Sequence, residues 1–239
     1  ISIIMLSNVS WITRIATLVF LISIFTVNWG SLDSDFTIVL SAYFLAFVSY
    51  LVLIKRNDIS FSQFAIIAVS AQILSMLFEP NLSVDYYRFL WDGEMAWNSI
   101  NAFDYKPNEV ILQPFLKDNG YMHSIYAGIS DLSRVNYTCY PTVNQSYFVA
   151  ATAFSSSLPV NTFVLKLTIV LTELVGAIYL FNILSFLKLP TKRLWVLFLN
   201  PLWIIECTGN THFEGVMISF MLIACYYLIQ KKALLGGAW

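Results

Sequence analysis

Long runs of apolar residues, broken by short charged turns, constrain this chain more than any other feature. A helix of roughly 17–25 apolar residues crosses the hydrocarbon core of a bilayer and satisfies its backbone hydrogen bonds internally. We therefore predict an all-α integral membrane protein with about six transmembrane helices. The predicted spans are residues 9–28, 36–54, 61–78, 160–186, 194–205 and 216–229.

The composition agrees with a lipid-embedded chain. Hydrophobic residues make up 58% of the sequence and charged residues only 11%, and the mean hydropathy is +0.71. A soluble domain of this length needs more charge to cover its surface. The net charge of −1 provides no basic excess for a phosphate backbone, so we predict no nucleic-acid partner.

The chain divides into three parts by pattern. We expect three transmembrane helices in residues 1–80 and a long polar, extracytoplasmic loop in residues 81–159. Residues 160–239 follow with three further spans and a polar extracytoplasmic stretch at 206–214. The fifth and sixth spans are short, so they cross fully only if that stretch enters the membrane or lines a cavity. Because the chain starts at Ile1 and stops soon after Lys232, we expect an N-terminal part of a longer protein.

The basic residues predict the orientation. Short loops rich in Lys and Arg stay cytoplasmic. In a six-span arrangement the basic segments 55–56, 188–193 and 231–232 all fall on one side, and the acidic turn at Asp33 and Asp35 falls on the other. The sequence therefore predicts a multi-pass protein of the inner (plasma) membrane, with its long loop and its active site facing the extracytoplasmic side.

The three cysteines show no metal-ligand spacing. Cys225 lies in an apolar run and is interpreted as a small buried residue. Cys139 and Cys207 lie near the same predicted membrane face, which leaves a disulfide open. We identify no metal-ligating residues and no certain cofactor, and the sequence leaves dependence on a divalent metal open.

A motif in the long loop carries charges at helical spacing. Asp85, Arg88 and Asp92 stand at i, i+3 and i+7, which places them on one face of a helix. Apolar and aromatic residues between them, such as Phe89 and Trp91, suit a helix lying in the membrane interface with its polar stripe toward a cavity. The alternative is an amphipathic interfacial helix whose charges are merely solvated and paired.

Ionisable residues also occur near or inside the predicted spans. Such groups are costly at membrane depth, and they usually line a cavity, form pairs or take part in chemistry. A plain loop at the membrane surface would also explain the group between the last two spans. Glu173, in the fourth span, must be protonated or paired and could serve only to lock helix packing. The group between the last two spans is Glu206, Asn210, His212 and Glu214.

Four segments together resemble one family. The run from Asp85 to Gly93 is similar to the motif Asp-x-Tyr-Arg-Tyr-x-Trp-Asp-Gly, with Phe89 for the second tyrosine. In order and spacing, this and the later segments resemble the polyprenyl-phosphate-sugar-dependent glycosyltransferases of the GT-C superfamily, especially the bacterial mannosyltransferase-like branch. The later segments are Asn101-Ala102-Phe103 with Pro107, then Tyr140-Pro141 with Gln145, and then Asn200-Pro201 with Glu206, His212 and Glu214.

Several positions depart from the family pattern. Ser99 stands where the family usually has glycine, Ala102 and Thr142 where it has proline, and Glu214 where it has aspartate. None of these changes removes a type of charge. They suggest a divergent member, for which a changed substrate is plausible.

The resemblance implies an inverting transfer of a sugar, with mannose the first expectation, from a polyprenyl-phosphate carrier to a glycan, lipid or protein acceptor at the extracytoplasmic face. Asp85 is the expected base for the acceptor hydroxyl, with Asp92 as the second catalytic residue. Arg88 and His212 would meet the charge of the leaving phosphate. The other expected substrate-binding residues are Tyr87, Trp91, Tyr140, Gln145, Glu206, Asn210 and Glu214.

The competing class is non-catalytic: a transporter, or a membrane subunit that keeps a GT-C-like fold inside a larger complex. A transporter would be expected to carry intramembrane charges in several broken helices, whereas here only Glu173 lies well inside a span. An inactive relative could lose the base, and Asp85 is present. The sequence therefore favours an enzyme.

Overall fold

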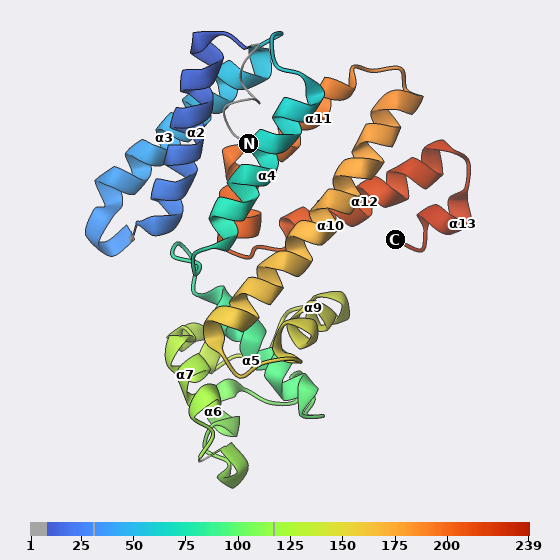
Figure 1. Cartoon of the computed structure of the whole chain (residues 1–239). Helices are drawn as coiled ribbons and strands as arrows, with labels where there is room; N and C mark the ends of the chain where they lie inside the picture. The colour runs from blue at the N-terminus through green and yellow to red at the C-terminus, as the bar shows by residue number, and fades with distance from the viewer. Residues whose placement is uncertain (1–8, 31, 117) are drawn as a thin grey trace. The chain divides into compact units, whose positions relative to one another are not determined.

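The computed structural model describes residues 9–30, 32–116 and 118–239, and every regular element among these residues is helical (Figure 1). This confirms the predicted all-α class. The elements run in the order α2 (Trp11–Trp29), α3 (Leu32–Lys55), α4 (Phe61–Met76), α5 (Asp85–Trp97), α6 (Pro107–Val110), η1 (Pro114–Leu116), α7 (Gly120–Gly128), α8 (Asp131–Arg134), α9 (Thr142–Thr152), α10 (Leu158–Phe186), η2 (Thr191–Arg193), α11 (Leu194–Phe198), η3 (Trp203–Gly209), α12 (Glu214–Ile229) and α13 (Ala233–Gly236).

The chain forms two compact units. Ile1–Asn81 and Ile169–Trp239 make up one, which we call the membrane unit, and Leu82–Thr168 make up the other, the loop unit. Helix α10 contributes residues to both units. The predicted loop is therefore a folded helical body and not an extended connection.

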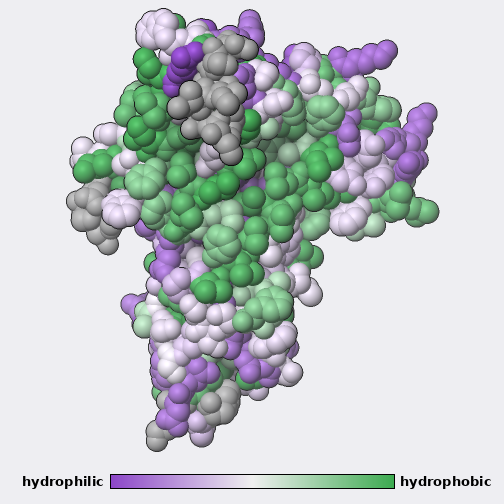
Figure 2. All heavy atoms as spheres, viewed as in Figure 1, coloured by the Kyte–Doolittle hydropathy of each residue, from purple (hydrophilic) through white to green (hydrophobic). Residues whose placement is uncertain are grey.

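Three helices are long and apolar enough to cross a membrane. They are α2, the Phe36–Lys55 part of α3, and α10, with mean hydropathies of 1.6, 2.3 and 2.0. Their outward faces carry large apolar side chains: Leu18 is 60% exposed and Phe44 is 67% exposed. Figure 2 shows hydrophobic residues spread broadly over this part of the surface. Such faces are stable against lipid and not against water, so the chain is a membrane protein.

The remaining predicted spans are shorter or broken. Helix α4 has 16 residues. The predicted span 194–205 divides into α11 and η3, because Pro201 has no backbone N–H to donate and disfavours helical backbone at the residue before it. Helices η3 and α12 pass the length and hydropathy test together, but they are bent by 107° at the break. Among the described residues, three helices are long and apolar enough to cross a membrane, or four if the bent pair is counted as one span.

Small and polar residues pack the interior of the membrane unit. Helix α2 packs against α3 and α4, and it buries Thr13, Ala16 and Thr17. Asn28 donates to the carbonyl of Ile24 (2.8 Å) and to Ser75 Oγ on α4 (3.2 Å). Apolar contact provides little driving force between helices in lipid, so close approach at small residues and interhelical hydrogen bonds hold such helices together.

A polar cluster joins the start of α2 to the turn between α3 and α4. Asp58 Oδ2 accepts from the Ser10 backbone N–H (2.8 Å) and from Thr13 Oγ1 (2.9 Å), and Oδ1 accepts from Arg56 Nε (2.9 Å). The hydrogen bond from Arg56, followed by that from the Ser10 backbone, lowers the pKa of Asp58 below its usual range. This carboxylate therefore stabilises the fold above the unfolded pKa of about 3.9, and its contribution is lost as the pH falls through the lower folded pKa.

Replacing Asp58 with alanine is expected to lower the thermal midpoint of unfolding at pH 7 by several degrees, because the groups that donate to this carboxylate lose their common acceptor. Thermal unfolding in detergent measures this effect. Glu79→Ala removes a carboxylate of the same unit that lies outside this cluster and should leave the midpoint unchanged. Equal midpoints for the two variants would contradict a stabilising role for the Asp58 cluster.

Helix α5 is the core of the loop unit. Nine of its 13 residues are buried, and it packs against α7 and α9. Phe89 stacks on Phe148 of α9 with the ring centres 4.7 Å apart, and Tyr140 meets Phe89 edge-on at 4.8 Å. The helix predicted at this motif is therefore present, and its polar stripe is turned into the loop unit.

Candidate functional site

The motif charges Arg88 and Asp92 form a buried ion pair one turn apart on α5. Arg88 Nε donates to Asp92 Oδ1 at 2.8 Å, and the two side chains are only 4% and 1% exposed. Burial raises the pKa of the Asp92 carboxyl, and the charge of Arg88 opposes this rise. A buried charge requires a partner, and here the partner comes from the same helix face, as the spacing predicted.

Segments distant in the sequence complete this pair. Arg88 Nη1 donates to the backbone carbonyls of Ser133 (2.7 Å) and Asn136 (3.0 Å). Gln145 Nε2 on α9 donates to Asp92 Oδ2 at 3.3 Å and to Thr138 Oγ1 at 3.2 Å. The network ties α5 to α9 and to the segment between α8 and α9. It brings together three of the predicted site residues, and Thr138 joins them without having been predicted.

Asp85 differs from Asp92 in its surroundings. It is half-buried at the first turn of α5, and its carboxylate makes no hydrogen bond or ion pair with any residue that the structure describes. Its charge acts on Tyr140, whose pKa is raised first by burial and then by Asp85. Of the two predicted catalytic carboxylates, Asp85 is therefore the one whose oxygens remain available to an incoming hydroxyl.

The predicted aromatic residues are not equally accessible. Trp91 is 2% exposed and packs against Tyr126, with the ring centres 5.8 Å apart. Tyr87 is half-buried beside Tyr86, with the ring centres 4.1 Å apart. Tyr140 is also half-buried. Tyr87 and Tyr140 therefore remain partly exposed, whereas Trp91 is part of the core.

Glycine at the end of the motif is required by packing. A methyl group at Gly93 would overlap the backbone carbonyl of Phe148, so α5 and α9 approach each other closely at this point. A methyl group at Gly120, at the start of α7, would meet no other atom within 4 Å.

Gly93→Ala is expected to destabilise the loop unit by about 1–3 kcal/mol, the usual cost of forcing extra atoms into a packed interior. Gly120→Ala is the matched control and should be neutral. Limited proteolysis of the loop unit reports both variants. Wild-type resistance in Gly93→Ala would show that α5 and α9 can separate without cost.

The membrane unit holds the second predicted group of site residues. His212 Nδ1 lies 3.5 Å from Glu206 Oε2, and Asn210 Nδ2 donates to the same oxygen at 3.3 Å. Tyr43 on α3 donates from its hydroxyl to Glu206 Oε1 at 3.2 Å. Glu214 is exposed at the start of α12. Tyr43 was missed because it lies in an apolar run where no local pattern marks it.

The backbone at the break between η3 and α12 is strained. Thr211, fully buried between Asn210 and His212, has a φ of 61°. A β-branched residue rarely adopts this left-handed conformation, and such strain persists where the surrounding structure enforces it. The strain occurs at the residue that joins the two side chains bound to Glu206, so the break holds this polar group in place.

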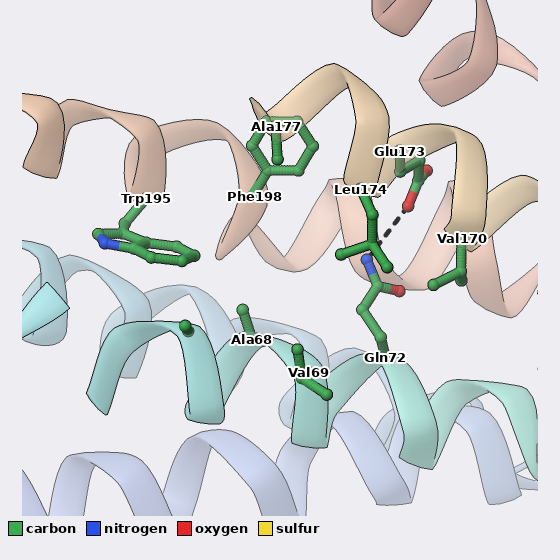
Figure 3. A pocket seen from close by; sticks show the side chains of 10 residues that line it. Ala68, Val69, Gln72, Val170, Glu173, Leu174, Ala177, Trp195 and Phe198 are labelled. Carbon is green, nitrogen blue, oxygen red and sulfur yellow. Dashed lines mark hydrogen bonds between the residues drawn. The ribbon is translucent and has the colours of Figure 1, made fainter. Parts of the chain in front are cut away.

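A separate cavity of about 110 Å³ lies within the membrane unit (Figure 3). Its lining is almost wholly apolar, and Trp195 lies at one end of it. At the other end Gln72 on α4 donates to Glu173 Oε2 on α10 at 3.2 Å, the bond drawn in Figure 3. Glu173 also accepts from Thr208 of η3. The carboxylate thus joins three helices, in agreement with the packing role considered for it.

No group of three His, Cys, Asp or Glu residues in the described part of the chain is arranged to hold a metal ion. The three cysteines are free, with Cys139 exposed and Cys207 buried.

Apolar helices that could span a membrane, together with a folded loop unit that carries the Asp-Arg-Asp motif (Asp85, Arg88 and Asp92), fit a GT-C type membrane glycosyltransferase. Residues 7–239 match the family model described as alpha-(1→6)-mannopyranosyltransferase, N-terminal domain, and the chain belongs to this family. Neither the comparison with curated proteins nor that with solved structures finds a significant match. The family confirms the resemblance seen in the motifs and makes the chain a glycosyltransferase of the mannosyl type.

Proposed function

We propose that this protein transfers mannose from a polyprenyl-phosphate carrier to a saccharide acceptor, with inversion, at the extracytoplasmic face of the plasma membrane. One observation carries the proposal: the Asp85 carboxylate makes no hydrogen bond or ion pair with any described residue, whereas the other two motif charges, Arg88 and Asp92, are paired with each other. The family supplies the sugar and the reaction class. The donor, the stereochemistry and the orientation are inferred from the motif resemblance and from the positions of the basic loops.

The proposed chemistry is a single displacement. The acceptor oxygen attacks the anomeric carbon while its proton passes to the Asp85 carboxylate. The bond between the anomeric carbon and the phosphate oxygen breaks, and the phosphate leaves with the electron pair. Arg88 Nη2 has no partner among the described residues, and we assign it to the developing charge on that phosphate. Asp92 and Gln145 position Arg88 through their network.

Orientation of the spans is part of the proposal. Six spans place Lys55, Arg56 and the basic segment 188–193 in the cytoplasm and the loop unit outside. For this arrangement α4, α11 with η3, and α12 must each cross despite their length, with the polar break at 210–213 sheltered from lipid. The Glu206–His212 group is proposed to bind substrate.

Sugar transfer by the full chain in membrane vesicles tests the proposal. Polyprenyl-phosphate [³H]mannose and a nucleotide-linked mannose are offered in parallel, with α-(1→6)-mannobiose as the acceptor. We expect label to reach the acceptor from the lipid-linked donor alone, with the opposite anomeric configuration in the product, and only in vesicles that expose the loop unit to the acceptor. Transfer from the nucleotide donor would refute the lipid carrier, and retained configuration would refute the single displacement.

A further inference from the structure

A second cavity lies within the loop unit, between the end of α5, η1 and the start of α7. Its volume is about 330 Å³, which falls in the range of small-molecule sites, about 300–1,000 Å³. The wall is of mixed character. Ile100, Leu116 and Met122 supply apolar surface, and Glu94, Asn98 and Asn119 supply polar groups.

This cavity is separate from the motif face. Glu94 follows Asp85 by nine residues, and at 3.6 residues per turn this is two and a half turns. Glu94 therefore projects from the side of α5 opposite Asp85. None of the residues bonded to Arg88 or Asp92 lines the cavity. The Asp-Arg-Asp motif does not account for it.

Glu94 is the unusual member of the wall. It is 9% exposed, and its Oε2 is buried without a hydrogen-bond partner among the described residues. Its other oxygen receives only a long hydrogen bond, 3.4 Å, from Asn98 Nδ2. Burial raises the pKa of this carboxyl. A buried carboxylate with an unsatisfied oxygen weakens a fold, so its presence in a cavity wall points to a ligand.

Backbone hydrogen bonds orient the two amides. Asn119 Oδ1 accepts from the Met122 backbone N–H as the N-cap of α7 (3.0 Å), which leaves Nδ2 as a donor. Asn98 Nδ2 donates to the Glu94 carbonyl (2.8 Å), which leaves Oδ1 as an acceptor. The cavity thus presents acceptors on Glu94 and Asn98 and a donor on Asn119.

Hydroxyl groups match this set better than other chemistry. A cation would be repelled by the partial positive charge of the Asn119 amide N–H group, and an anion would be repelled by the Glu94 carboxylate. An apolar ligand would leave Glu94 Oε2 unsatisfied. A hydroxyl both donates and accepts, and the C–H faces of a pyranose suit the apolar wall. We propose that this cavity binds a saccharide, with its hydroxyl groups on Glu94 and Asn119.

Binding of α-(1→6)-mannobiose to the full chain in nanodiscs, measured by titration calorimetry, tests the inference. The inference rests on the proposed function only for the choice of this probe. Glu94→Gln keeps the shape and replaces an acceptor oxygen by a donor. Asn119→Asp keeps the cap of α7 and removes the donor. Each variant is expected to raise the dissociation constant for mannobiose about tenfold or more, because each removes one hydrogen bond between the protein and a sugar hydroxyl.

Three further variants make the result specific. Glu109→Gln alters an exposed carboxylate of the loop unit outside the cavity and should bind as the wild type. Ile100→Phe fills the cavity without touching a polar group and should weaken binding. In an Asp85→Asn background, Glu94→Gln should still weaken mannobiose binding even though sugar transfer is lost, so failure of the cavity and failure of the proposed reaction give different results.

A stability readout separates lost binding from misfolding. Burial raises the pKa of Glu94, so the stability of the fold falls as the pH rises and this carboxyl becomes charged. Glutamine carries no charge, and Glu94→Gln should therefore raise the thermal midpoint of unfolding at pH 7. Unchanged dissociation constants in Glu94→Gln and Asn119→Asp would overturn the proposal. Absence of saturable binding of mannobiose and of mannose by the wild type would overturn it as well.

Discussion

Replacing Asp85 with asparagine is expected to lower the rate of mannose transfer about 10²–10⁴-fold, the usual contribution of a general base. Asparagine keeps the size of the side chain and its hydrogen-bonding capacity but cannot take the proton of the acceptor hydroxyl. The carboxylate makes no bond to any described residue, so the fold should not depend on it. Initial rates with the lipid-linked donor, taken with the thermal midpoint, measure both effects.

Asp131→Asn is the matched control for this prediction. The Asp131 side chain is 98% exposed in the loop unit, and among the residues that the structure describes it pairs only with Arg134, at 3.0 Å. Its loss should change neither rate nor midpoint. If Asp85→Asn transfers mannose as fast as the wild type, Asp85 is not the base, and Asp92 becomes the next carboxylate to replace.

Replacing Arg88 with methionine is expected to reduce the free energy of unfolding of the loop unit by about 3–5 kcal/mol, the usual cost of leaving one member of a buried pair without its partner. The carboxylate of Asp92 would remain buried, with Gln145 and Thr138 as the neutral hydrogen-bonding side chains left beside it. The loss should shrink as the pH falls, because a protonated Asp92 carries no charge. Hydrogen exchange of the α5 and α9 amides measures the change.

Two comparisons decide whether the effect comes from the buried charge. Lys106→Met removes the cation from a partly exposed pair with Glu109 (3.4 Å), and it should cost no more than about 1 kcal/mol. The double variant Arg88→Met with Asp92→Asn removes both charges and should recover much of the stability lost in the single variant. A double variant less stable than Arg88→Met would show that Asp92 is stabilising on its own.

The helical spacing of Asp85, Arg88 and Asp92 was sufficient to predict α5 and the shared face of its charges. It favoured a polar stripe facing a cavity, but it could not show that Arg88 and Asp92 are buried inside the loop unit. That outcome depends on the carbonyls of Ser133 and Asn136 and on Gln145, which lie at least 45 residues away along the chain. Satisfying these buried charges needs groups from other segments, which local periodicity does not reveal.

The group around Glu206 was likewise predictable only in part from the sequence. Its own residues were visible as polar positions between two short apolar runs. Tyr43, which donates to Glu206 from 163 residues away, carries no local signal because a tyrosine in an apolar span is ordinary. Glu94 was missed for a related reason, since its significance lies in an unsatisfied oxygen and a cavity and not in any motif.

The sequence by itself determined that this protein is helical, lies in a membrane and carries a glycosyltransferase motif. Apolar run length and residue spacing are properties of adjacent residues, and the bilayer imposes helical structure on such runs. Only the tertiary structure decided which charges are paired, which carboxylate stays available and where the cavities lie. Those outcomes depend on which distant segments pack together, because a buried polar group is satisfied or left unsatisfied by its neighbours in space.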